Sequence, residues 1–308
     1  MGDFKNLMNE MLTFIDAVGF TDEGAYSLRY NGVSYAHGNS EHVRIIKKED
    51  KQGIDIYIDG QCDGEEVHIP VIVDKSGIRE KVYNDFYISD GAKVTIAAGC
   101  GIHNCGEKDS QHDGVHSFYI GKDCEVLYIE NHFGDGDGSG ARILNPTTNI
   151  YVGENSTFTL DTSQIRGVDA TERFTFVELE QNAKLHVLEK LMTHGNQRAK
   201  SNMDIDLKGS DSSAQIVSRS VAKENSSQVF HPAAIGKSRC NAHIQCDSII
   251  MDNAKVQSIP EINAQNIDAA IIHEAAIGRI NDEQVTKLRT LGMTVEEAEA
   301  VIIKTFLN

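Results

Sequence analysis

The chain has 308 residues, of which 40% are hydrophobic and 24% charged, and its formal charge is −17. A field of that sign repels phosphate backbones, so we expect no nucleic acid partner. No apolar run approaches the roughly 18 residues that a membrane span needs, and residues 1–18 carry acidic groups and lack the basic start of a secretory signal. The sequence therefore predicts a cytoplasmic protein that does not enter a membrane.

Six cysteines are spread along the chain, and no two of them form a C-x-x-C pair. Without an export signal, this pattern favours free thiols over disulfides. It also gives no support to thioredoxin-like redox chemistry or to a zinc ribbon. The thiols lie at positions 62, 100, 105, 124, 240 and 246.

The first predicted element is a helix near the N-terminus. Apolar residues recur there with the helical period and form a single stripe that can pack on a core. The stripe consists of Phe4, Leu7, Met8, Met11, Leu12 and Ile15. Gly19 ends the helix, and we expect a helical segment over residues 1–42.

Between residues 43 and 280 the pattern changes to short runs that alternate apolar and polar residues. A phrase recurs in which an apolar residue precedes a turn of Gly, Asp or Asn, and a second alternating run follows. Copies begin at Ile88, Ile120, Val152, Leu179 and Leu207, with a shorter copy at Met251. The first five starts are roughly 27–32 residues apart, a period typical of solenoids.

One such unit cannot bury its own apolar face, so units must stack to cover it. An internal period of two excludes helical repeats. The pattern predicts a mainly β fold, a right-handed parallel β-helix, over residues 43–280. An antiparallel sandwich is the structural alternative, because its turns recur at similar short spacings.

Residues 281–308 return to a helical pattern and predict a helical hairpin. Asn281 can cap the first helix, and Gly292 can close it. Thr294 and Glu297 have the spacing of a capping box for the second helix. An apolar face on this hairpin would suit a partner protein, and docking on the β-helix is an equally good interpretation.

Soft ligands are dense between Cys100 and His132. Thiolate and imidazole are what zinc or iron prefer, but C-x4-C alone is not a metal signature. Histidines that line turns and buried thiols are therefore the favoured interpretation. The possible secondary metal ligands are Cys100, Cys105, His112, His116, His132 and, later in the chain, Cys240.

The segment GDGDGSG at residues 134–140 resembles the opening of an EF-hand loop. Position 12 of that loop would be Pro146, where calcium requires a bidentate Glu. The segment is also followed by no helical pattern, so it does not fit a dinucleotide-binding motif. We interpret it as a turn between units of the β-helix.

Residues 238–278 gather Cys246, His273 and Glu274. In a β-helix, residues one turn apart lie about 4.8 Å from each other, so groups separated by one period can be neighbours. Cys246 and Glu274 are 28 positions apart, close to the period above. We therefore expect a thiolate, an imidazole and a carboxylate to converge there.

The same region resembles the C-terminal core of the SufB/SufD family. The resemblance is carried by QCDSIIMDNAKVQSIPEI at residues 245–262 and by HEAAIGRINDEQVTKLRTLGMTVEEAEAVIIKTFL at residues 273–307. The order of these anchors matches the family's Q-C-D-S turn, its Pro, its H-E-A segment and its two final helices. The β-helical body resembles the family more loosely.

The resemblance implies a scaffold subunit that builds a transient iron–sulfur cluster at a subunit interface, as a homodimer or as a heterodimer with a paralogue. It implies that the C-terminal helices dock a SufC-type ABC ATPase. A cysteine desulfurase system would donate the sulfur, and apoproteins would receive the cluster. The essential cysteine of the family corresponds to Cys246, and its E-H-E motif corresponds to Ile272, His273 and Glu274.

Ile272 departs from the family because an apolar side chain cannot bind iron. Together with the short chain, this departure suggests a compact homodimeric form related to SufB, and a SufD-like accessory subunit is the alternative. We expect no enzyme activity in this chain, which lacks a Walker A motif. Two more distant alternatives are a carbohydrate-active β-helix enzyme and a cysteine hydrolase that uses Cys246 with His273.

Overall fold

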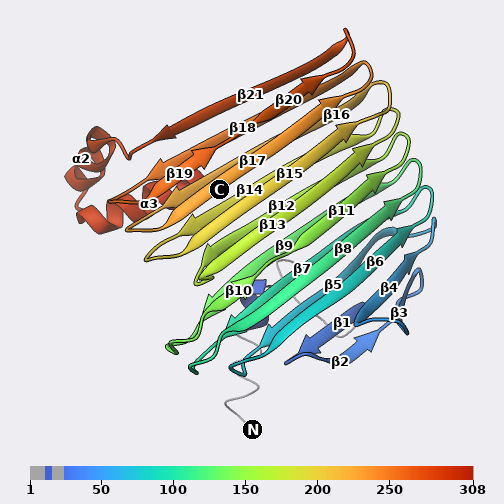
Figure 1. Cartoon of the computed structure of the whole chain (residues 1–308), viewed down its shortest axis with the longest axis horizontal. Helices are drawn as coiled ribbons and strands as arrows, with labels where there is room; N and C mark the ends of the chain where they lie inside the picture. The colour runs from blue at the N-terminus through green and yellow to red at the C-terminus, as the bar shows by residue number, and fades with distance from the viewer. Residues whose placement is uncertain (1–10, 16–23, 308) are drawn as a thin grey trace.

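Figure 1 shows the computed structural model, which describes residues 11–15 and 24–307. From β5 onward the chain alternates between two long sheets, and one turn of the chain adds one strand, or two short strands, to each sheet. From β5 onward the neighbouring strands of each sheet run parallel, as β7 and β9 do. This arrangement confirms the predicted parallel β-helix.

Among the described residues, the first sheet contains ten strands. Their order is β2 (Val33–Gly38), β1 (Ala25–Tyr30), β5 (Asp63–Val73), β7 (Lys93–His103), β9 (Glu125–Asp135), β12 (Thr157–Arg166), β14 (Lys184–Thr193), β16 (Ser212–Ala222), β18 (Cys240–Ile250) and β21 (Ala269–Gly278).

In the part of the chain that the structure describes, the second sheet contains eleven strands. Its main path is β19 (Lys255–Ser258), β17 (Ser227–Gly236), β15 (Arg198–Leu207), β13 (Ala170–Leu179), β10 (Arg142–Leu144), β8 (Ser110–Ile120), β6 (Arg79–Ile88), β4 (Gly53–Ile58) and β3 (Val43–Lys47). Off that path, β11 (Thr147–Val152) pairs with β13 and β8, and β20 (Glu261–Ala264) pairs with β17.

The recurring phrase of the sequence marks one corner of the β-helix, where the chain passes from the second sheet to the first. The turn residues there stack in the left-handed region of φ, which Asn and Asp tolerate better than most residues. They are Asp123 (φ 56), Asn155 (φ 59), Asn182 (φ 54) and Asp211 (φ 64). The copy at Met251 lies at the opposite corner, between β18 and β19, because both corners use the same turn chemistry.

The N-terminal region is not helical throughout, contrary to our expectation for residues 1–42. Strands β1 and β2 form an antiparallel hairpin whose turn is Asn31-Gly32, with φ of 48° and 82°. Asn-Gly is the preferred dipeptide for such a two-residue turn. Residues 11–15 are helical as predicted, whereas Phe4, Leu7, Met8 and Gly19 lie outside the described residues.

The described helical residues dock on the outer face of the first sheet. Met11 and Ile15 are buried, and they share a cluster with Phe133. Gly99 permits this contact, because a Cβ there would lie 2.2 Å from the carbonyl oxygen of Ile15.

The C-terminal hairpin consists of α2 (Asp282–Thr290) and α3 (Val295–Leu307). Asn281 caps α2 by accepting from the Glu283 N–H, and Thr294 and Glu297 form the predicted capping box. Helix α3 is the docked helix: its buried Ile303 and Leu307 pack on Val221 of β16. All side chains of α2 are exposed or half-buried. Among the described residues, no helix is long and apolar enough to cross a membrane.

The two ends of the β-helix differ (Figure 1). At the N-terminal end, the edge strands β2 and β3 pair antiparallel with their neighbours β1 and β4. At the C-terminal end, β21 and the short strands β19 and β20 form the edges, and their side chains are mostly exposed. Exposed strand edges are templates for pairing with another chain.

Candidate functional site

Cys246 and His273 contact each other inside the open end of the β-helix. They lie on the adjacent parallel strands β18 and β21, in which Cys246 is opposite Ala275 and His273 is opposite Ile244. Cys246, Ile244 and His273 therefore project from the same inner face, because side chains alternate along a strand. The distance between Cys246 Sγ and His273 Nε2 is 3.1 Å. The predicted convergence of thiol and imidazole is present.

Glu274 does not join this pair, contrary to our expectation. It lies opposite Gln245 and projects from the outer face, where its carboxylate is 3.5 Å from His243 Nε2. The expectation failed because the neighbour of Cys246 one turn later is residue 275, and a shift of one residue moves a side chain to the other face of the sheet. Ile272 projects from the same outer face as Glu274 and is 55% exposed.

Burial keeps both members of the pair neutral. It raises the pKa of the Cys246 thiol to about 11, opposed by a contact with Ser258 and reinforced by the charges of Glu189 and Asp247. Burial also lowers the pKa of His273. A metal ion that bound this thiol would have to displace its proton. The pair therefore offers a metal ion one soft sulfur ligand and one neutral nitrogen ligand at the same place.

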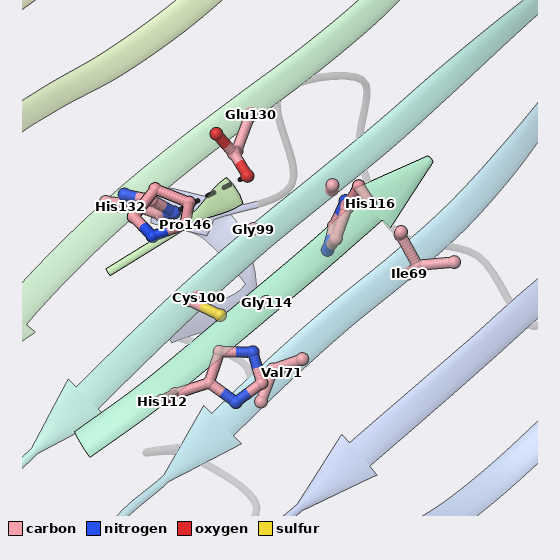
Figure 2. Close-up of a pocket in the computed structure, with 11 residues that line it drawn as sticks. Ile69, Val71, Gly99, Cys100, His112, Gly114, His116, Glu130, His132 and Pro146 are labelled. Atoms are coloured by element: carbon pink, nitrogen blue, oxygen red, sulfur yellow. Dashed lines mark ion pairs between the residues drawn. The ribbon is translucent and has the colours of Figure 1, made fainter. Parts of the chain in front are cut away.

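A second group of chemically active side chains surrounds a small cavity deeper in the β-helix (Figure 2). The cavity measures about 10 Å³, which is room for about one water molecule. Its polar lining consists of Cys100, His112, His116, Glu130 and His132. In the part of the chain that the structure describes, no three His, Cys, Asp or Glu side chains are arranged to hold one metal ion.

Charge pairing and hydrogen bonds satisfy this buried group. Burial alone would raise the pKa of Glu130, but the Arg173 guanidinium, which forms an ion pair with that carboxylate, holds it well below its usual range. The Tyr128 hydroxyl lies 2.7 Å from His116 Nδ1 and donates to Glu130 over 3.0 Å. Burial lowers the pKa values of His116 and His132 to about 4. These histidines are therefore neutral members of a packed polar network.

The remaining candidate ligands lie elsewhere. Cys240 is fully buried in the main hydrophobic cluster. Cys105 is exposed after the end of β7. Four of the six possible secondary ligands therefore share the cavity, and these two do not. Cys100 is a buried thiol as expected, whereas the three histidines of the cavity lie in strands β8 and β9 and do not line turns.

A family model described as "SUF system FeS cluster assembly, SufBD core domain" matches residues 84–306. The match includes both Cys246 and His273 and extends from β6 into α3. This chain belongs to the SufBD family. Membership agrees with the resemblance that the Q-C-D-S segment and the C-terminal helices indicated.

Curated relatives extend the similarity over most of this SufBD chain. A SufBD family iron–sulfur cluster assembly protein of Methanocaldococcus jannaschii is 25% identical over 325 residues, covering 97% of this chain and 98% of the relative. One from Pyrococcus horikoshii is 30% identical over 208 residues, covering 65% and 61%. One from Archaeoglobus fulgidus is 24% identical over 273 residues, covering 87% and 71%. The chain thus spans between 61% and 98% of these three relatives.

Several buried charges of this SufBD chain were missed by sequence reasoning. Glu80 accepts hydrogen bonds from Arg29 and contacts His112 Nδ1 at 2.9 Å; burial would raise its pKa, but His112 and Arg29 lower it to about 2. Glu189 accepts from Ser201 and Ser218. The sequence contains a signal for two of these charges. Glu130 and Glu189 occupy positions that the alternating pattern of β9 and β14 assigns to inward-facing residues.

Proposed function

We propose that this chain is a non-enzymatic scaffold on which an iron–sulfur cluster is assembled transiently, with Cys246 and His273 among its ligands. The proposal rests on the 3.1 Å contact between their side chains in the last two turns of an open β-helix end, in a chain of the SufBD family. Thiolate is the usual ligand of iron–sulfur clusters, and imidazole replaces it in some of them. A ligand set with few thiolates suits a cluster that is built and then released.

The open end supports assembly between two subunits. Such clusters commonly take four protein ligands, and one chain brings two into contact. A second copy that docked on the same end would bring an equivalent pair, so a homodimer would supply four. Exposed apolar side chains lie along this end, as expected of a surface that another subunit covers. They include Ile262, Ile267 and Ile272.

The partners follow from the family resemblance and from the exposed hairpin. We propose that α2 and the following Leu291, which is 76% exposed, form part of the surface that docks a SufC-type ABC ATPase. ATP hydrolysis would then reside in that partner. A cysteine desulfurase system would supply sulfur, and cytoplasmic apoproteins would receive the cluster.

Anaerobic reconstitution tests this function. The purified chain is incubated with ferrous iron and sulfide, and the absorption spectrum, iron content and sulfide content are compared with those of Cys246→Ser and His273→Gln. We expect an oxygen-sensitive cluster in the natural chain and its loss in both variants. Cys105→Ser is the matched control, because it removes an exposed thiol and disturbs no core, and it should retain the cluster.

Two results would contradict the proposal. Equal loss of the cluster in Cys105→Ser and Cys246→Ser would mean that the cluster site is not the one at the open end. No cluster in the natural chain, either alone or with the ATPase bound, would leave the SufD-like accessory subunit as the better function. Circular dichroism of each variant distinguishes loss of the site from loss of the fold.

A further inference from the structure

A second thiol–imidazole pair lies at an exposed corner, away from the proposed cluster site. Cys105 Sγ is 3.0 Å from His103 Nε2, and the thiol is exposed. His103 is the last residue of β7, and Asp135, the last residue of β9, is its partner in the parallel register. The other ring nitrogen of His103, Nδ1, is 3.6 Å from Asp135 Oδ2. Thiol, imidazole and carboxylate thus lie in a row, in which Nδ1 is buried without a hydrogen-bond partner and the carboxylate lies just beyond hydrogen-bond reach.

The turn that carries Cys105 is fixed by Asn104, which is fully buried. The Asn104 side-chain amide donates to the carbonyl oxygens of Lys108 and Gly140 over 2.9 and 3.0 Å. Its Oδ1 accepts from the Gly106 N–H over 3.1 Å. The backbone on both sides of the thiol is therefore held by one side chain.

The glycine-rich segment at residues 134–140 supports the same turn. The N–H groups of Gly138 and Gly140 donate to the carbonyl oxygens of Asn104 and Gly106, each over 3.0 Å. A Cβ at Gly138 would lie 2.3 Å from the Gly106 carbonyl oxygen, so only glycine permits this approach. The interpretation of GDGDGSG as a turn between units holds, and the structure adds that it positions Cys105.

The row has the order of an activated nucleophile, a base and a group that orients the base. A base within hydrogen-bond reach of a thiol can take its proton, and contacts of a free site are often longer than those of the reacting one. Attack on a carbonyl would also need free N–H donors for the oxyanion. The N–H of Gly106, the residue after the thiol, is already committed to Asn104. Attack on sulfur has no such requirement.

We propose that Cys105 is a nucleophilic thiol that forms mixed disulfides with small disulfide molecules, with His103 as its base and Asp135 as a positioning residue. In this exchange, His103 Nε2 accepts the thiol proton and Cys105 Sγ attacks one sulfur of the disulfide. The sulfur–sulfur bond of the small molecule breaks, and the departing thiolate takes the proton from His103. One molecule of free thiol is released for each Cys105 that is modified.

Several charged groups surround the imidazole of His103. Asp135 faces it from β9, and Arg166 at the end of β12 lies 3.9 Å from the other oxygen of that carboxylate. The turn itself contributes Glu107 and Lys108, and the facing segment contributes Asp137. Each of these groups belongs to the same corner.

The test uses the full, reduced, metal-free chain and the chromogenic disulfide 5,5′-dithiobis(2-nitrobenzoic acid), with peptide mapping by mass spectrometry. We expect the first label on Cys105, at a rate that falls less steeply with decreasing pH, between about pH 8 and pH 6, than the rate in His103→Gln. In His103→Gln the rate should fall about tenfold per pH unit, as it does for an ordinary thiol with a pKa near 8.5. Asp135→Asn should give an intermediate profile. His186→Gln, an exposed histidine on β14, is the matched control and should retain the natural profile.

Two outcomes would overturn the proposal. One is a His103→Gln chain with the natural rate and pH profile, which would make Cys105 an ordinary exposed thiol. The other is a first label on any other cysteine. An Asp135→Asn chain with an unchanged profile would overturn the role of that carboxylate. Because the experiment contains no iron and reads a different cysteine, its failure would leave the proposed scaffold function untouched.

Discussion

Two thiol–imidazole pairs of nearly equal length lie in opposite surroundings in this SufBD chain. Cys246 and His273 are 3.1 Å apart inside the β-helix, whereas Cys105 and His103 are 3.0 Å apart at an exposed corner. The donor atoms are the same, so distance does not distinguish the two sites. What differs is the access of solvent. In addition, a carboxylate, that of Asp135, lies beside the exposed pair.

The buried pair is suited to holding an ion and the exposed pair to reacting with a molecule. Cys246 is 3% exposed, and burial raises the pKa of its thiol to about 11. Near neutral pH, its proton leaves to a large extent only when a cation compensates the thiolate. Cys105 has solvent on one side and an imidazole backed by Asp135 on the other. The environment of a Cys–His pair, more than the distance between its sulfur and nitrogen atoms, decides which chemistry is available.

The largest expected difference between the two pairs is in alkylation. At about pH 8, a thiol with a pKa near 11 is ionised in about one molecule in a thousand, against roughly a quarter of molecules for an ordinary thiol. Burial slows access to Cys246 further. We therefore expect iodoacetamide to modify Cys105 at least about a hundredfold faster than Cys246. Peptide mapping of a native time course measures both rates, and similar rates would break the comparison.

Part of this contrast was predictable from the sequence. The recurring turns located the β-helix, because Asp123 and Asn155 supply the left-handed turn positions that stack at one corner. The resemblance located Cys246 and His273. The register could not be predicted, because repeat spacings of roughly 27–32 residues do not fix a position to a single residue. For that reason Glu274 was placed on the wrong face.

The exposed pair was beyond sequence reasoning for a different reason. His103 and Asp135 are neighbours only because β7 and β9 align without a shift at their ends. The glycine-rich segment that holds the turn resembles a calcium-binding loop. Such a motif is recognised from consecutive residues, so it does not reveal which strands lie beside it. By contrast, the hairpin at Asn31-Gly32 had a readable signal, the Asn-Gly dipeptide between two alternating runs. Missing it extended the expected helical segment too far.

A third imidazole, that of His132, is buried in the interior of the β-helix. His132 lies in the interior cavity, where burial lowers its pKa to about 4. Below about pH 6.5 the unfolded chain binds a proton at this residue and the folded chain does not, so stability should fall as pH falls from 6.5 to 4 and then level off. The loss from this residue should reach on the order of 3.5 kcal/mol, since one unit of pKa corresponds to about 1.4 kcal/mol.

Urea unfolding at about pH 7.5 and pH 5 measures this loss. His132→Gln should shrink the difference between the two pH values, because glutamine does not titrate. His186→Gln, on the exposed outer face, is the control and should behave as the natural chain does. An unchanged pH dependence in His132→Gln would mean that folding does not lower the pKa of this imidazole.

The smallest expected effect sharpens the definition of the buried pair. Glu274 follows His273 directly, yet its carboxylate lies on the outer face beside His243. Glu274→Gln should therefore load iron and sulfide to within about twofold of the natural chain, whereas His273→Gln should lose the cluster. Substitutions at two adjacent residues would then differ completely in cluster loading, because adjacent side chains of a strand project from opposite faces. A severe loss in Glu274→Gln would mean that β21 shifts by one residue when two subunits meet, which would bring the carboxylate to the thiol and return it to the ligand set.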